Sequence, residues 1–378
     1  MGAFLDKPKT EKTNLSGEGN GISYGMSSMQ GWRMNMEDAH IAETAMSQDP
    51  PYKNWSFFAV FDGHAGPEVA AKASNQLLQY LIDTKEFKEM TKALKKSDGV
   101  LTPECLDFIV KGIRTGFLNF DECTKNTTDC SNSGSTAVCA IITPSHTIIG
   151  NLGDSRAVLS SKNTGVFGTT DHKPYHDKEK QRIVGAGGQV MIQRINGTLA
   201  VSRAFGDYQY KDHPLLPAHH QLVSPEPDTY IRPRCDDTDE FLVLACDGVY
   251  DVMENDELAQ FVRGRLAVHT DLTQVCNDVL DECLAKGSRD NMTVVIVKFP
   301  AAPTIDATRQ ELETRWTNDV NELIQEYVEN MMSSENFDND DLVNTQLIIQ
   351  DIQANERYQP LAGIPTHSLR TLITKVRI

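Results

Sequence analysis

The chain has 378 residues, 39% of them hydrophobic, which is typical of a soluble globular protein with one large and one smaller domain. Its net charge of −17 argues against nucleic acid as the main partner, because binding a phosphate backbone needs clustered Lys and Arg. There is no apolar run of the roughly 18 residues that a membrane helix needs, no apolar core of a secretory signal and no Cys-x-x-Cys pair. We therefore expect an intracellular, cytoplasmic or nuclear protein that is monomeric, has no transmembrane segment and carries reduced cysteines.

The N-terminal residues Met1 to Asp6 partly match the signal for N-myristoylation. Gly2 stands where the lipid would be attached, but Asp6 stands where Ser or Thr is preferred. Lipid-mediated membrane contact through Gly2 is one interpretation, and a flexible N-terminus without lipid is the other.

The first third of the chain predicts two strands and two helices. Ile22 to Ser28 alternates like a strand, and the apolar run from Trp55 to Phe61 has the composition of a buried strand. Pro67 can begin a helix that continues to Ile82. A second helix is predicted from Cys105 to Phe120, because its apolar residues fall on one face.

The middle of the chain is rich in predicted strands. Thr136 to Ile142 and Thr147 to Leu152 flank a short turn, and Ala157 to Ser160 continues the pattern. Met191 to Val201 predicts a hairpin, with Asn196-Gly197 as its two-residue turn.

The following hundred residues complete the predicted core. Glu240 to Cys246 is an apolar strand that ends in Asp-Gly, and Met292 to Phe299 is a closing strand. Two helices are predicted between them, at Glu257 to Leu266 and Leu272 to Leu284. Antiparallel hairpins beside clustered helices indicate the α+β class.

Pro300-Ala-Ala-Pro303 predicts a boundary between a domain of residues 1–300 and a C-terminal helical domain of residues 301–378. Residues 301–341 carry eleven acids against two arginines, which favours a solvated acidic face, with a docking role as the alternative. Apolar residues at helical spacing predict a long helix that packs in a small bundle. They are Leu312, Trp316, Val320, Leu323, Tyr327 and Met331.

Carboxylates recur where predicted strands end. A single Asp at such a place is usually a turn residue, but the ends of strands in one sheet system converge in space. Carboxylates with a backbone carbonyl and no Cys/His cluster suit Mg²⁺ or Mn²⁺, and two such ions can activate water for attack on a phosphate. The segments at strand ends or strand-adjacent turns are Asp62-Gly63, Gly153-Asp154, Asp247-Gly248 and Asp290-Asn291, and Glu37-Asp38 adds two carboxylates after a polar segment.

Three further side chains could act on a phosphate at such a site. His64 stands two residues after Asp62 and could donate a proton to a leaving oxygen, although a His in a Gly-rich turn is more often structural. Arg33 offers a planar fork for a phosphate, and a plain surface Arg is the alternative. Arg203 is a weaker candidate for contact with the substrate.

Three other patterns are weaker evidence for a catalytic or binding site. Cys283 begins the Cys-x₅-Arg spacing of a thiolate phosphatase loop, but it lies late in a predicted helix and not before one. Gly185-Ala-Gly-Gly188 is an incomplete dinucleotide motif. His219-His220 lies in a Pro-containing loop, where solvated side chains are the simpler interpretation.

Eight motifs, in chain order, resemble the metal-dependent protein phosphatases of type 2C, and closely their animal alpha/beta branch. The resemblance covers roughly residues 1–300, and the segment Tyr208 to Gln221 and the tail diverge most. The motifs are Arg33-Met-Asn-Met-Glu-Asp38, Phe61-Asp-Gly-His-Ala-Gly66, Ser133-Gly-Ser-Thr-Ala137, Gly153-Asp-Ser-Arg156, Asp171-His-Lys-Pro174, Leu199 to Asp207, Ala245-Cys-Asp-Gly-Val-Tyr-Asp251 and Gly287-Ser-Arg-Asp-Asn291.

The resemblance implies an α-β-β-α sandwich and hydrolysis of phosphoserine and phosphothreonine in proteins by water that two Mg²⁺ or Mn²⁺ ions activate. In this family pattern His64 protonates the leaving oxygen and Arg33 holds the phosphate. The metal positions are Asp62, the Gly63 carbonyl, Asp247 and Asp290 as ligands, Glu37 and Asp38 through water, and Asp154 and Asp251 at a weaker third ion.

The resemblance also favours lipidation at Gly2. A scaffold of the same fold that binds signalling partners without catalysis is the alternative function. Such a scaffold should have lost ligand positions, whereas this chain keeps every matched carboxylate.

Overall fold

A computed structural model describes residues 4–125, 127, 130, 132–332 and 354. Its core is two antiparallel sheets. The larger has six strands, in the order β1 (Phe4–Gly19), β2 (Ile22–Arg33), β16 (Met292–Lys298), β15 (Asp239–Ala245), β9 (Arg156–Ser161) and β10 (Gly165–Gly168). The other has five, in the order β14 (Asp228–Pro233), β8 (His146–Leu152), β7 (Ala137–Ile142), β4 (Ser56–Phe61) and β3 (Ala39–Glu43).

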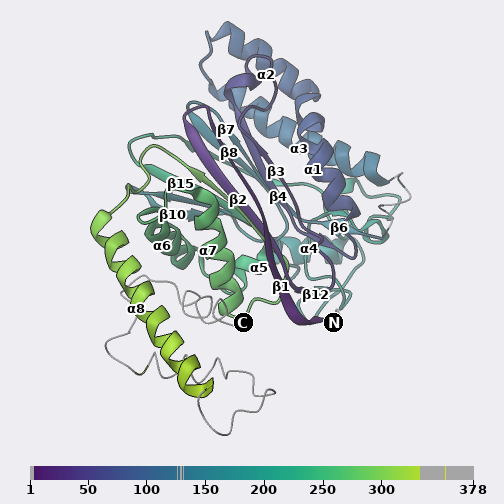
Figure 1. The fold of residues 1–378 in the computed structure, drawn as a ribbon. Coiled ribbons are helices and arrows are strands. Elements are labelled where there is room, and N and C mark those ends of the chain that lie inside the picture. The colour runs from purple at the N-terminus through teal and green to yellow at the C-terminus, as the bar shows by residue number, and fades with distance from the viewer. Residues whose placement is uncertain (1–3, 126, 128–129, 131, 333–353, 355–378) are drawn as a thin grey trace.

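Helices cover the outer face of each sheet, and the two sheets pack against one another (Figure 1). The five-stranded sheet carries α1 (Glu68–Ile82), α2 (Lys85–Lys96) and α3 (Pro103–Lys125). The six-stranded sheet carries α5 (Asp247–Tyr250), α6 (Asn255–Leu266) and α7 (Leu272–Ala285). The predicted α-β-β-α sandwich of the α+β class is therefore confirmed.

Side chains along each central strand point alternately into two apolar layers, one against the helices and one against the other sheet. This explains why the sequences of these strands are nearly continuous apolar runs. In β15, Phe241 and Val243 face the helices, whereas Leu242 and Leu244 face the other sheet. Because a strand points successive side chains to opposite faces, a strand buried on both faces needs apolar residues at every position.

Two small sheets and one further helix lie outside the sandwich layers. A three-stranded sheet has the order β13 (Phe205–Gly206), β6 (Gly134–Ser135) and β5 (Gly63–His64). A hairpin of β11 (Val190–Met191) and β12 (Arg194–Ile195) follows α4 (Asp177–Gly185).

The hairpin differs from the predicted one. Asn196 and Gly197 do form a turn with positive φ angles, closed by a hydrogen bond from Thr198 N–H to the Ile195 carbonyl. However, the paired strands β11 and β12 are joined by Ile192 and Gln193, whose φ angles of 51° and 61° are also positive. The segment therefore contains two consecutive tight turns in place of one long hairpin.

Several elements were not predicted: β1, β3, α2, β10, α4 and β14, together with α5 and the two-residue strands β5, β6 and β13. In the C-terminal region, α8 (Ala307–Met332) confirms the predicted long helix, with Trp316, Val320 and Ile324 buried. Arg265 of α6 donates two hydrogen bonds to Glu313 of α8, at 2.6 and 2.7 Å. The rest of the predicted helical bundle and Gly2 lie outside the described residues, and the domain boundary near residue 300 stays a prediction. Among the helices described here, none has the length and apolarity to span a bilayer.

Candidate metal centre and active site

Carboxylates from several strand ends meet at one edge of the sandwich. Oxygen atoms of Asp38 and Asp62 and the sulfur of Cys246 lie within 4.8 Å of one another. Asp62 follows β4, Asp38 precedes β3, and Asp247 begins α5 directly after β15. Asp290 precedes β16 and contributes to the negative potential at this cluster. The structure thus brings together the carboxylates that the sequence predicted to converge.

The electrostatics of this cluster favour a divalent cation. Burial raises the pKa of Asp62 well above its usual value, and the nearby charges of Asp247 and Asp38 raise it further. Burial likewise raises the pKa of Asp38 to about 7, and the pKa of Asp247 well above the ordinary range. A cation among these groups would compensate for burial and mutual repulsion at the same time.

The donor set fits a hard metal ion. The Oδ1 atom of Asp38 is buried and has no hydrogen-bond partner, while Oδ2 accepts a bond of 2.7 Å from Thr293. Burial raises the pKa of the Cys246 thiol, so it stays uncharged, and it accepts a hydrogen bond from the Thr293 N–H. The remaining donors are oxygens, as Mg²⁺ and Mn²⁺ prefer.

Gly63 lets two segments of the backbone approach one another beside the cluster. A Cβ atom at this position would lie 2.3 Å from the carbonyl oxygen of Glu37. The Asp62 carbonyl accepts a hydrogen bond of 2.9 Å from Thr136 N–H, which holds the turn after β4. Only glycine fits here, so the motif Asp62-Gly63 reflects packing as well as ligand geometry.

Arg33 lies beside the candidate ligand Asp290. Its Nη2 atom is 2.6 Å from Asp290 Oδ2, and its side chain is 41% exposed. The charges of Asp62 and Asp247 also act on this guanidinium. Because a guanidinium has five N–H donors, Arg33 can pair with Asp290 and still present donors to a phosphate.

His64 points one ring nitrogen at a buried carboxylate that the sequence did not single out. Its Nε2 atom lies 2.7 Å from Asp207 Oδ2, and Asp207 is 3% exposed. Burial alone would lower the pKa of His64, but the charge of Asp207 outweighs this effect and raises it. The charges of Asp154 and Glu37 also act on His64, which places it within the electrostatic field of the site.

Asp154 and Asp251, the positions expected at a third ion, line a cavity of about 370 Å³ together with Asp247. Lys173, from the Asp171-His-Lys-Pro motif, forms an ion pair with Asp154. Burial raises the pKa of Asp251. Asp247 belongs to both the acidic cluster and this cavity, so the two adjoin one another. The hairpin residues Ile192, Gln193 and Arg194 also line the cavity.

Arg203 lies in a buried network of ion pairs. It is 3% exposed and pairs with Glu179 at 2.7 Å and with Asp228 at 3.0 Å. Its guanidinium also donates to the Glu226 carbonyl. These contacts give Arg203 a structural role, and its contact with substrate stays a prediction.

Sequence reasoning also missed the residue that ties the start of β16 to β2 and to the segment between β2 and β3. Asn291 Oδ1 accepts a hydrogen bond of 2.9 Å from the Glu37 N–H, and Nδ2 donates to the carbonyls of Gln30 and Asn35. The only available signal was its place beside Asp290 in a matched motif.

The alternative sites find no support in the geometry. Cys283 is fully buried in α7, where burial raises its thiol pKa, so it is not a reactive thiolate. Gly185 ends α4, and His219 and His220 lie in a short 3₁₀ turn with their rings 4.4 Å apart.

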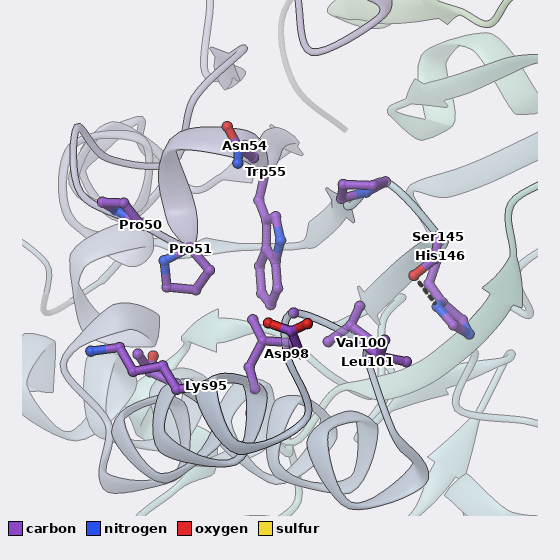
Figure 2. Close-up of a pocket in the computed structure, with 14 residues that line it drawn as sticks. Pro50, Pro51, Asn54, Trp55, Lys95, Asp98, Val100, Leu101, Ser145 and His146 are labelled. Carbon is purple, nitrogen blue, oxygen red and sulfur yellow. Dashed lines mark hydrogen bonds between the residues drawn. The ribbon is translucent and has the colours of Figure 1, made fainter.

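A larger cavity of about 710 Å³ lies elsewhere, at the start of β4 and the turn between β7 and β8 (Figure 2). Trp55, Leu101 and three prolines line it, and Ser145 and His146 are hydrogen-bonded at one side. Because Trp55 and Asp62 stand at opposite ends of β4, this cavity is separate from the carboxylate cluster.

Comparison with known proteins agrees with this geometry. Residues 22–292 match the family model for protein phosphatase 2C. The chain is 60% identical over 377 residues to protein phosphatase ppm-1.A of Caenorhabditis elegans, covering all of this chain and 80% of that protein. It is 49% identical over 357 residues to protein phosphatase 1B of Mus musculus, covering 90% of each chain.

The fold also resembles a solved phosphatase from Toxoplasma gondii, with a TM-score of 0.63 and 26% identity. That likeness covers 76% of this chain and 96% of the other. The family match, the close relatives and the cluster of strand-end carboxylates lead to one conclusion. This chain belongs to the protein phosphatase 2C family of metal-dependent protein serine/threonine phosphatases.

Proposed function

We propose that this phosphatase cleaves phosphoserine and phosphothreonine esters at two Mg²⁺ or Mn²⁺ ions held by Asp62, the Gly63 carbonyl, Asp247 and Asp290. The observation that carries the proposal is the buried, mutually repelling carboxylate cluster, in which the charges of Asp247 and Asp38 add to burial and raise the pKa of Asp62. When bound, such ions polarise a phosphoryl group and supply hydroxide near neutral pH. Glu37 and Asp38 would support these ions through water, and a weaker third ion would take Asp154 and Asp251.

The side chains around the cluster have separate tasks. Arg33 orients the phosphate through the guanidinium donors that Asp290 does not use. His64 gives a proton to the leaving oxygen of the Ser or Thr side chain. In this scheme water attacks the phosphorus directly and no side chain becomes phosphorylated. The Cys246 thiol beside the cluster is buried and its pKa is raised, which does not favour a thiolate nucleophile there.

The direct test is release of phosphate from a phosphothreonine peptide. Wild-type protein should be active with Mn²⁺ or Mg²⁺ and inactive in EDTA, and Asp247→Asn should lose activity while keeping its circular dichroism spectrum. Cys283→Ser is the matched control and should retain activity. Metal-independent hydrolysis, or an unchanged rate in Asp247→Asn, would refute the proposed site.

We also propose a cytoplasmic and nuclear location, with membrane contact through a myristoyl group on Gly2. The Met-Gly start of the sequence supports this assignment. Cells supplied with an alkyne-tagged myristate should label the wild type but not Gly2→Ala. Labelling of both proteins, or of neither, would contradict the assignment.

A further inference from the structure

The partner of His64 is held by its own structural supports. Asp207 has a φ angle of 53°, a left-handed conformation that costs free energy in a residue other than glycine. Its N–H donates a hydrogen bond of 3.0 Å to the Ser133 carbonyl, and its own carbonyl accepts one of 2.8 Å from Tyr210. The preceding residue, Gly206, donates to Asp121 Oδ1 at 2.8 Å. The backbone is thus fixed on both sides of a strained position.

The three-stranded sheet aligns this carboxylate with the imidazole. His64 pairs with Gly134 across β5 and β6, and Gly134 pairs with Gly206 across β6 and β13. Asp207 therefore leaves β13 at the level of His64. The two side chains approach one another over the middle strand.

Gly134 provides the space for this approach. A Cβ atom at Gly134 would lie 2.4 Å from Asp207 Oδ2 and equally 2.4 Å from His64 Nε2. Any larger residue would therefore overlap both atoms of the pair. The glycine in the middle strand is a geometric requirement of the contact between His64 and Asp207.

We propose that Asp207 is a positioning residue, whose carboxylate accepts the Nε2–H of His64 and so presents Nδ1 of the imidazole as the proton donor to the substrate. A proton on Nε2 fixes the neutral tautomer and the ring orientation. Among the described residues, none forms a hydrogen bond with Nδ1.

The inference rests on the proposed role of His64, in which one proton moves from the imidazole to the leaving oxygen. The donor is the imidazolium, with one proton on Nε2 held by Asp207 and one on Nδ1. As the phosphorus–oxygen ester bond breaks, the Nδ1 proton moves to the leaving oxygen and the bond electrons stay on that oxygen. The ring that remains is neutral and keeps its Nε2–H bonded to Asp207, and solvent later restores the Nδ1 proton.

Substrates with different leaving groups test the role of Asp207. A Ser or Thr alkoxide needs a proton, whereas p-nitrophenolate leaves without one. Asp207→Asn should therefore lower kcat for a phosphothreonine peptide about 100-fold, but lower kcat for p-nitrophenyl phosphate only a few-fold. The double variant with His64→Gln should be no slower than His64→Gln alone, because the two residues act as one unit.

Glu240→Gln is the matched control. Glu240 is a buried carboxylate of β15, paired with Arg263 at 2.6 Å, and it has no hydrogen bond to His64 or to the supports of Asp207. This variant should affect both substrates equally. Equal losses on both substrates in Asp207→Asn, or additive losses in the double variant, would overturn the inference.

A spectroscopic measurement covers the case in which Asp207→Asn does not fold. Nitrogen-15 chemical shifts of His64 in the wild-type protein should identify the neutral ring as the Nε2–H tautomer. A neutral Nδ1–H tautomer would overturn the inference. Equal losses on both substrates in His64→Gln would instead refute the proposed role of His64.

Discussion

At the scale of single residues, the site depends on positions where no larger side chain fits. Gly63, Gly134 and Gly248 all stand where a Cβ atom would lie within 2.4 Å of another atom. Each one lets a second segment come close: Glu37 at Gly63, the pair of His64 and Asp207 at Gly134, and Asn291 at Gly248. The carboxylates can converge because these backbones pack so closely.

We predict that Gly63→Ala lowers the phosphatase rate about 100-fold, because the Cβ would push the backbone away from Glu37 and misplace Asp62. The protein should still fold, since the strained contact is at the edge of the sandwich. Gly185→Ala, at a site with no atom near the added Cβ, is the control and should be neutral. A fully active Gly63→Ala would show that this approach is not needed.

The buried ion pair of Glu179 and Arg203 predicts a dependence of stability on pH. Burial alone would raise the pKa of Glu179, but Arg203 and Arg182 lower it from 4.5 to about 2. The ionised form therefore stabilises the fold above pH 4.5, by about 3 kcal/mol, and this contribution is lost as the pH falls towards 2.

Urea unfolding of metal-free Glu179→Gln and wild type checks this prediction. Their difference in unfolding free energy should be about 3 kcal/mol at pH 7 and should shrink between pH 4.5 and 3. Asp107→Asn, which breaks an exposed pair with Lys111, should cost less than about 1 kcal/mol. A difference for Glu179→Gln that stays constant with pH would contradict the assignment.

Much of the site was predictable from sequence, because Asp-Gly and Glu-Asp pairs stood where apolar runs ended. Asp207 was not, because its contact with His64 depends on a three-stranded sheet whose strands have two residues each. The ion pairs of Arg203 were not predictable for a related reason. Its partners Glu179 and Asp228 lie 24 and 25 residues away, and no local pattern predicts that pairing.

At the scale of elements, strands buried on two faces were predictable and exposed edges were not. β4 and β15 read as apolar runs because both of their faces are buried. β1 is an edge strand of sixteen residues that pairs only with β2, and its side chains are largely polar and solvated. Its sequence therefore shows no regular alternation of apolar residues. The strand β1 is recognised only from its pairing with β2.

The turn between β11 and β12 predicts a stabilising change. Ile192 is 89% exposed and has a positive φ angle, which is unfavourable for a β-branched residue. Replacing Ile192-Gln193 with Asn-Gly, which suits two positive φ angles, should stabilise the fold by about 1 kcal/mol.

Thermal unfolding measures this effect, with Gly197→Ala as the opposite control. Gly197 has a φ angle of 77°, so the added Cβ should destabilise its turn. A lower melting temperature in the Asn-Gly variant would indicate that Ile192 makes a contact worth more than its strain. Because Ile192 lines the acidic cavity, the phosphatase rate of this variant should be measured as well.

At the scale of the whole molecule, the chain joins a catalytic sandwich to a C-terminal helix. Arg265, with 1% of its surface exposed, connects the two through Glu313. Sequence composition indicated a change near residue 300, yet Ala301 and Ala302 are buried. Buried packing therefore continues into the segment Pro300 to Pro303, from which the boundary was predicted.

The central claim is that the carboxylate cluster is a metal centre, and calorimetric titration of metal-free protein with Mn²⁺ tests it most directly. We predict that each chain binds two Mn²⁺ ions tightly and a third ion more weakly. Asp247→Asn should lose at least one tight ion, whereas Asp107→Asn should bind as the wild type does. Absence of tight Mn²⁺ binding by folded wild-type protein, or unchanged binding in Asp247→Asn, would contradict this account.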